Sequence, residues 1–158
     1  MCSTISRKTT NSAKKEQTRS TYAFIATYLK KGDGNFRDFN KLYVWYQYVD
    51  KKHVKREIQN MNYQDFLFTR YWQIIRSYII STKSKCTCEI CGDQDHLEVH
   101  HSRYKHLLGE ELNHLEELQC LCHHCHSKLH WLENLKKLRR AGKVILPSPS
   151  PTERSVSS

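Results

Sequence analysis

Apolar residues between positions 21 and 81 recur every three to four residues, which is the period of amphipathic helices. Asn35 and Asn62 are each followed three residues later by an aspartate, a pattern typical of a helix N-cap with an acid in the first turn. Fifteen of the seventeen aromatic residues lie before position 80 at this spacing, which favours a packed helical core over base-stacking platforms. The first predicted helix covers Thr21–Lys31, with Tyr22, Ile25 and Leu29 on its apolar face. The second runs from Asn35 to Val49, and residues 50–60 could continue it. The third runs from Asn62 to about Ser81.

The pattern changes after residue 81. Leu97–Ser102 is predicted to be a short strand. A helix with a leucine at every third position is predicted from about Cys125 to Arg140, and Gly142 lies just beyond its end. The sequence therefore predicts an α+β, mostly helical fold.

The two ends of the chain are polar. Residues 1–20 are rich in Ser, Thr, Lys and Arg and are expected to be a disordered basic arm. Residues 142–158 are expected to be a disordered Pro/Ser tail. No apolar run approaches the roughly 18 residues that a membrane span needs, and no signal peptide is recognisable, so a cytoplasmic protein without a membrane partner is expected.

Positive charge is concentrated in the first half. Residues 1–85 carry 17 Lys and Arg against 6 Asp and Glu, a net +11, whereas residues 86–158 carry 9 against 10. Such an excess suits a polyanion-binding surface, although many solvated protein surfaces are similarly charged.

Six of the seven cysteines lie between residues 86 and 125. Two Cys-x-x-Cys pairs, separated by thirty residues, have the spacing of zinc knuckles: Cys88 with Cys91 and Cys122 with Cys125. A reducing compartment also favours metal ligation over disulfides. Only 38% of the chain is hydrophobic, so its core should be small and would benefit from a metal. Cys86 and Cys120 extend each pair to Cys-x-Cys-x-x-Cys, so the spacing leaves open whether they compete for the ion.

Nine of the ten histidines lie between residues 96 and 130. His100 and His101 are adjacent on the predicted strand, so their side chains should point to opposite faces. His126 and His130 are four residues apart on the final helix and should share a face. Each histidine alone is more simply explained as polar surface, but the constellation favours a functional site.

These motifs together resemble the HNH endonuclease family, the ββα-metal nucleases. The resemblance covers about 65 residues, from Phe66 to His130, and rests on several segments in the family's order: TRYWQIIRSYI, CEICG, LEVHHSRY, LGEEL, EELQCLCHHCH and SKLH. It implies N-terminal helices followed by a zinc-stapled ββα-metal finger and a C-terminal helix. The implied divisions are the arm, a helical region over residues 21–62, an HNH domain over residues 63–141, and the tail.

The resemblance also implies roles for individual residues. His101 stands at the position of the general base, and His100 and His126 stand at the ligand positions of a catalytic Mg²⁺ or Mn²⁺. Glu117 occupies the family's usual Asn position, where a carboxylate would either orient His101 or lower activity. Zinc on the four paired cysteines would be structural, and whether His130 touches a metal is left open.

The expected function is metal-dependent hydrolysis of DNA, by nicking or cutting a duplex. The alternative is a catalytically inactive, zinc-stabilised DNA-binding module, which would need the cysteines but not His101. A purely structural zinc protein is a third reading, in which the basic half is incidental. The sequence leaves the DNA site and the oligomeric state open.

Overall fold

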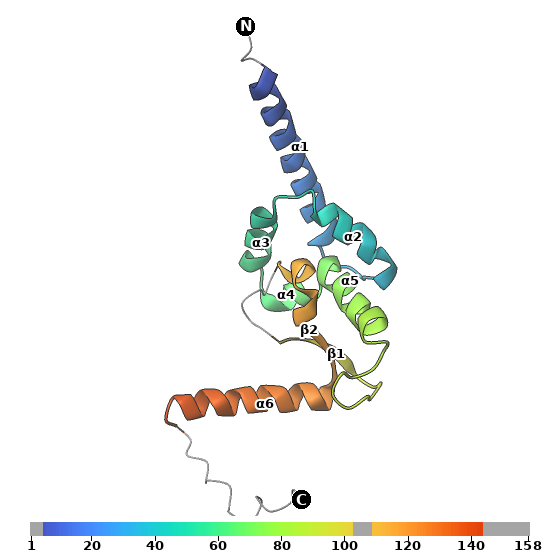
Figure 1. The fold of residues 1–158 in the computed structure, drawn as a ribbon, viewed down its shortest axis with the longest axis vertical. Coiled ribbons are helices and arrows are strands. Elements are labelled where there is room, and N and C mark those ends of the chain that lie inside the picture. Colours follow the sequence, from blue (N-terminus) through green and yellow to red (C-terminus); the bar gives the residue numbers. More distant parts are fainter. Residues whose placement is uncertain (1–4, 103–108, 144–158) are drawn as a thin grey trace, which may run out of the picture.

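The computed structural model of the chain describes residues 5–102 and 109–143. Over these residues the protein is mostly helical, with one two-stranded antiparallel sheet (Figure 1). The helices and strands are α1 Ile5–Tyr28, α2 Phe39–Tyr46, α3 Lys51–Asn60, α4 Tyr63–Leu67, α5 Arg70–Tyr78, β1 Leu97–His101, β2 Leu118–Cys122 and α6 His123–Arg140. Short 3-10 turns occupy Phe36–Asp38, Glu111–Asn113 and Leu115–Glu117, and a π turn, Ile79–Lys83, extends α5. No helix in the described ranges is long and apolar enough to cross a membrane.

Side-chain caps divide the helical region. The predicted caps Asn35 and Asn62 are confirmed, because each side chain accepts a hydrogen bond from the backbone two residues on. Asp50 accepts from two backbone N–H groups at the start of α3, so residues 50–60 form a separate helix and do not continue α2. Thr69 caps α5 in the same way and separates it from α4. A cap satisfies N–H groups that the helix itself leaves unpaired, and it therefore fixes where a new helix begins.

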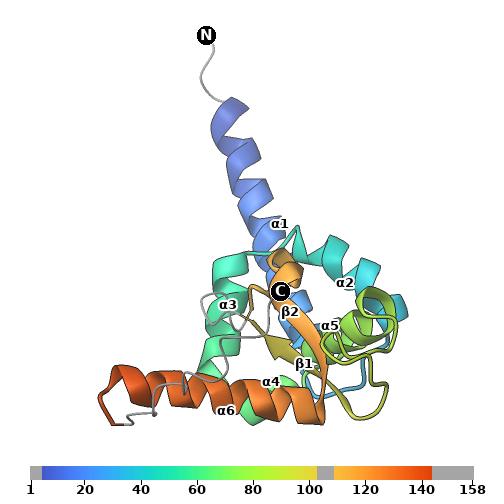
Figure 2. The same cartoon turned by 60° about the horizontal axis from the view of Figure 1, so that its bottom comes forward.

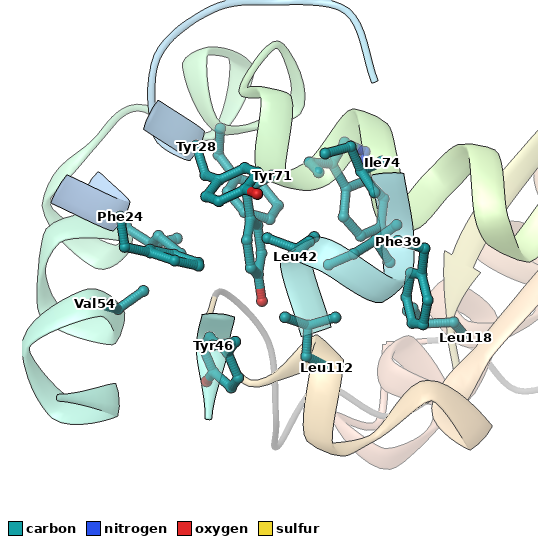
Figure 3. Close-up of a cluster of buried hydrophobic side chains, with 14 of the residues drawn as sticks. Phe24, Tyr28, Phe39, Leu42, Tyr46, Val54, Tyr71, Ile74, Leu112 and Leu118 are labelled. Atoms are coloured by element: carbon teal, nitrogen blue, oxygen red, sulfur yellow. The ribbon is translucent and has the colours of Figure 1, made fainter. Parts of the chain in front are cut away.

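The core lies where α1, α2, α3 and α5 meet, and aromatic side chains fill much of it (Figure 3). Phe24 and Tyr28 are buried on α1, whereas Tyr22, predicted on the apolar face, is 59% exposed. Ile25 and Leu29 are partly buried beside them. The packed face of α1 is therefore rotated from the predicted one, because the Phe24 and Tyr28 rings pack against aromatic residues of α2 and α5.

The first helix is longer than the sequence predicts. Residues 5–20, expected to be disordered, are helical and continue into α1, which projects beyond the rest of the protein (Figure 1). No Gly or Pro interrupts residues 5–28. Once Phe24 and Tyr28 anchor the C-terminal half, adding further turns needs no new nucleus, and this offsets the weak amphipathicity of residues 12–19.

The C-terminal part has a strand–strand–helix order. β1 and β2 pair antiparallel, with Val99 opposite Cys120, and α6 follows β2 directly and contacts both strands (Figure 2). The strand prediction is confirmed to within one residue, and α6 begins two residues before the predicted start. Leu112, Leu118 and Cys120 belong to the same buried cluster as α1, α2 and α5, so the helical region and the ββα segment share one core.

Candidate metal centres

Four cysteines meet at the junction of β2 and α6. The Sγ atoms of Cys88, Cys91, Cys122 and Cys125 lie within 4.8 Å of one another, and those of Cys91 and Cys122 are 3.6 Å apart. Four thiol ligands at this spacing are a donor set that tetrahedral zinc accepts. The predicted convergence of the two pairs is confirmed, and the four side chains can hold a metal ion such as zinc.

Each cysteine pair lies on a turn that its backbone explains. In the first, Cys88 donates its N–H to the Asp93 carbonyl at 2.7 Å, and Gly92 donates back to the Cys88 carbonyl at 2.9 Å. Gly92 has φ +78°, a conformation that glycine adopts without strain. The second pair lies where β2 becomes α6, with Cys122 at the N-cap position. The tight turn thus holds the thiols of the first pair together, and the start of α6 holds those of the second pair together.

The thiols differ in pKa because backbone N–H groups stabilise the charged form of one of them, whereas burial and the other cysteines destabilise the charged form of another. Burial opposes ionisation of Cys88, but backbone N–H groups of three neighbouring residues outweigh it and lower the pKa of this thiol to about 6. Burial and the neighbouring cysteines raise the pKa of Cys125 to about 12. The cluster therefore stabilises one thiolate but resists further negative charge. A divalent cation would remove this conflict, which supports a metal site.

Cys86 and Cys120, whose role the spacing left open, lie outside this cluster. Cys86 is exposed on the loop before the first pair. Cys120 is fully buried in the aromatic core, where burial raises the pKa of its thiol. The fold therefore assigns the Cys-x-x-Cys pairs, and neither extra cysteine, to the metal cluster.

A second cluster joins β1 to α6. Nitrogen atoms of His100, His126 and His130 lie within 4.8 Å of one another, and the three rings meet edge to face with centroids 4.5 to 5.1 Å apart. The structure thus brings together His100 and His126, the two predicted ligands, and adds His130. The spacing of four residues from His126 to His130, one helical turn, was the sequence signal for this third member.

Hydrogen bonds orient the helical histidines. The Glu98 carboxylate accepts from Nδ1 of His126 and, at 3.0 Å, from Nδ1 of His123. With its proton on Nδ1, His126 has a lone pair on Nε2, which faces Nε2 of His130 at 2.9 Å. The Nδ1 atom of His130 lies 3.8 Å from a Glu133 oxygen. Metal-binding histidines commonly have this arrangement, with a carboxylate on one ring nitrogen and the ion on the other.

The ionisation of this site also favours a cation. Burial, followed by the proximity of His126 and His130, lowers the pKa of His100, so its neutral form predominates near pH 7. Burial tends to raise the pKa of Glu98, but hydrogen bonds from His123 and His126 outweigh burial and lower it. Neutral imidazoles backed by an ionised carboxylate are the forms that bind a metal ion. Glu98 was missed at the sequence level, although it shares a strand face with His100 two residues away.

His101 points away from these three histidines. Its ring stacks on Trp72 of α5, with centroids 5.2 Å apart and planes 15° from parallel, and the residue is 8% exposed. Its Nε2 is buried without a hydrogen-bond partner among the described residues and lies 3.7 Å from Oε1 of Glu111. The prediction that His100 and His101 face opposite sides of the strand is confirmed.

Glu111 is the carboxylate found beside His101. The Glu111 side chain is fully buried, and its Oε2 accepts hydrogen bonds from the Tyr71 hydroxyl at 3.0 Å and from the Gly109 N–H at 2.7 Å. Burial, followed by the adjacent carboxylate, raises the pKa of Tyr71 well above its usual value, so this hydroxyl stays protonated and donates. The position of Glu111 could not be predicted from helix or strand periodicity, because this residue lies in a 3-10 turn between the two strands.

Glu117, the acid that the sequence suggested would either orient His101 or lower activity, lies in the turn before β2. Its carboxylate lies in a group with His114 and Glu116, whose ligand atoms are within 4.8 Å of one another. Its backbone carbonyl accepts hydrogen bonds from the N–H and hydroxyl of Ser102, at 2.8 and 2.9 Å, and so fixes the end of β1. The role of Glu117 toward His101 therefore stays a prediction, and Glu111 is a second carboxylate, which the sequence did not indicate, beside His101.

Comparison of the chain with protein-family models, with curated proteins and with solved structures finds no match in any of the three.

Proposed function

We propose that this protein is a metal-dependent endonuclease of the HNH type, which hydrolyses phosphodiester bonds in DNA. The observation that carries the proposal is the convergence of His100, His126 and His130 on one point of a strand–strand–helix unit. The four-cysteine cluster directly beside this unit has the place of the structural zinc in the resemblance that the sequence shows. The residues at the centre are thus those that a ββα-metal nuclease would use.

The three histidines would hold one divalent ion, Mg²⁺ or Mn²⁺. When bound, the ion supplies positive charge that stabilises the scissile phosphate and the leaving oxygen. Imidazole nitrogen suits Mn²⁺ and Ni²⁺ better than Mg²⁺, so the donor set favours the softer ions. Glu98 holds the His126 ring in the tautomer that this role requires.

His101 is the general base in this proposal. A neutral imidazole can accept a proton from water near pH 7, and the resulting hydroxide attacks the phosphorus. The Glu111 carboxylate, 3.7 Å from Nε2, favours the tautomer with the proton on that nitrogen. Nδ1 then carries the lone pair that takes the proton. The separation exceeds a hydrogen bond, and catalytic contacts of this kind often shorten when substrate binds.

Zinc on the four cysteines has a structural role in this proposal. Its four thiolate ligands leave no open position for substrate. Cys122 and Cys125 flank the start of α6, and His126 follows immediately. Zinc would therefore fix the direction in which α6 presents His126 to β1.

DNA is the proposed partner because the basic half of the chain lies on the same folded unit. Residues 1–85 carry a net +11, and α1 exposes Lys14, Lys15 and Arg19 along its projecting half. Exposed cations that neutralise phosphates provide affinity without sequence specificity.

The test is cleavage of supercoiled plasmid with Mg²⁺ or Mn²⁺, compared with a reaction from which both are omitted. We expect nicked or linear product, and a loss of about 10²–10⁴ in rate for His101→Ala. His126→Ala should also lose activity but recover partly as Mn²⁺ is raised, whereas His101→Ala should not. His124→Ala changes an exposed histidine outside both clusters and serves as the control. Unchanged cleavage by His101→Ala would contradict the mechanism.

One observation favours a second candidate, a zinc-stabilised DNA-binding module without nuclease activity. His101 is nearly buried against Trp72, which also suits a purely structural histidine. This candidate predicts DNA binding with no cleavage in any metal, together with loss of stability in His101→Ala.

A further inference from the structure

We propose that a groove beside the histidine cluster binds one unpaired DNA base next to the phosphate that is cut. This inference rests on the proposed nuclease function and specifies its substrate class. The groove has a volume of about 320 Å³, and its walls come from α4, α5, β1 and α6. We call it the base groove, and the residues that matter here are Tyr63, Phe68, Trp72, Gln73, Arg76 and His126.

The walls of the base groove are aromatic and open to solvent. Tyr63, the first residue of α4, is 53% exposed, and Phe68, which follows its last residue, is 58% exposed. Phe66, between them, is buried and anchors α4 in the core. Trp72 is 3% exposed and also lines the groove, and its ring stacks on His101. Aromatic side chains outside the core suit stacking of nucleic acid bases, since every base presents a flat π face. Tyr71 and Trp72 of the neighbouring α5 are buried, whereas Tyr63 and Phe68 depart from the packed pattern that the sequence predicted.

Cations accompany the aromatic walls. The Lys31 ammonium lies 5.9 Å from the centre of the Phe68 ring and 3.3 Å from Oδ1 of Asp65 on α4. Arg76 holds its guanidinium in place by donating to the Leu97 carbonyl at 2.8 Å. A fixed guanidinium can stack on a base or pair with its edge, and a lysine beside an exposed ring can contact the connecting phosphates. Both oxygens of Glu98, the acid that lines the groove, accept hydrogen bonds from histidines of α6.

The position of His126 links the base groove to the chemistry. His126 lines the groove and is also a member of the histidine cluster. A base seated in the groove is therefore joined to a phosphate near the proposed catalytic ion. A base inside a duplex is stacked and paired, so it reaches such a groove only from a single strand or after flipping out. The proposed substrate is consequently DNA with an unpaired nucleotide at the cleavage position.

The experiment has a binding arm and a cleavage arm. In the first, zinc-loaded protein without Mg²⁺ or Mn²⁺ is titrated into a fluorescent single-stranded DNA of about a dozen nucleotides. Phe68→Ala and Tyr63→Ala each remove one exposed ring, and Tyr48→Ala, which is 67% exposed but outside the groove, is the matched control. We expect about tenfold weaker binding for either groove variant and little change for the control.

The cleavage arm compares a fully paired duplex with a duplex that contains one unpaired nucleotide. The unmodified protein should cut beside the unpaired nucleotide faster, and Phe68→Ala should lose this preference while still cutting the paired duplex. Replacing the unpaired nucleotide by an abasic one should abolish the preference in the unmodified protein and have no effect in Phe68→Ala.

Failure of this inference differs from failure of the nuclease proposal. Cleavage with equal rates on both duplexes, and equal binding by Phe68→Ala, Tyr63→Ala and the control, would refute the base groove while leaving the nuclease intact. An apolar partner in the groove, in place of a base, would give that same result. Weaker binding by both groove variants with no cleavage in any metal would support the groove and refute the nuclease.

Discussion

Replacing Glu111 by Gln should change the tautomer of His101 and suppress cleavage. The Oε2 position of this carboxylate accepts two donors, one of them the Gly109 N–H, so the carbonyl oxygen of a glutamine must occupy it. The glutamine NH₂ then takes the Oε1 position, 3.7 Å from Nε2 of His101. An NH₂ group donates, so it favours His101 with its proton on Nδ1. That form has no lone pair on the nitrogen proposed to accept the proton.

The expected losses of stability and of cleavage rate follow from these contacts. Glu111→Ala would leave two buried donors unpaired and lower the free energy of unfolding by about 1–3 kcal/mol for each. A loss of cleavage in that variant could then not be separated from a loss of folded protein. Glu111→Gln keeps an acceptor for both donors and should lower the free energy of unfolding by about 1–2 kcal/mol, since bonds to a charged acceptor are the stronger ones. The rate should fall by about 10²–10⁴, or roughly 3–5 kcal/mol of barrier. The comparable Asp-to-Asn change in a serine protease triad lowers kcat by about 10⁴.

The assay combines plasmid nicking with urea unfolding and zinc analysis of the same preparations. Glu110→Gln is the matched control, because it removes the neighbouring carboxylate, which pairs with Lys55 at 2.8 Å and is partly exposed. If folded, zinc-loaded Glu111→Gln cuts as fast as Glu110→Gln, the assignment of Glu111 as the residue that orients His101 is wrong.

Two further predictions concern the zinc cluster and the first helix. Cys122→Ala should lose the zinc and unfold the ββα segment, because a structural site couples about 10–16 kcal/mol of binding free energy to folding. The control is Cys120→Ala, which changes a buried cysteine two residues away on β2 and should retain one zinc by metal analysis. One zinc in purified Cys122→Ala would refute the assignment of the four cysteines as its ligands. Replacing Lys14, Lys15 and Arg19 by Gln should flatten the salt dependence of DNA binding by about 0.9 in log–log slope for each phosphate that is no longer neutralised. An unchanged slope, measured by anisotropy between low and physiological salt, would show that α1 does not touch DNA.

Local sequence determined the parts of this protein that depend on few neighbours. The caps at Asn35 and Asn62, the strand at Leu97 and the long final helix all follow from signals within about one turn of chain. The convergence of the cysteine pairs is also local in origin, since each Cys-x-x-Cys forms its own turn and one ion can join two of them. The opposite orientations of His100 and His101 follow from the alternation of a strand.

Tertiary structure decided what local patterns leave undetermined. Phe24 and Tyr28, and not Tyr22, face the core because α2 and α5 present aromatic surfaces to that side of α1. Glu111 reaches His101 from a 3-10 turn that Tyr71 and Gly109 hold, and no periodic pattern marks such a turn. The base groove likewise exists only where α4 and α5 meet β1 and α6. A repeating pattern identifies which residues are apolar, but the shape and charge of the neighbouring elements select which side chains meet.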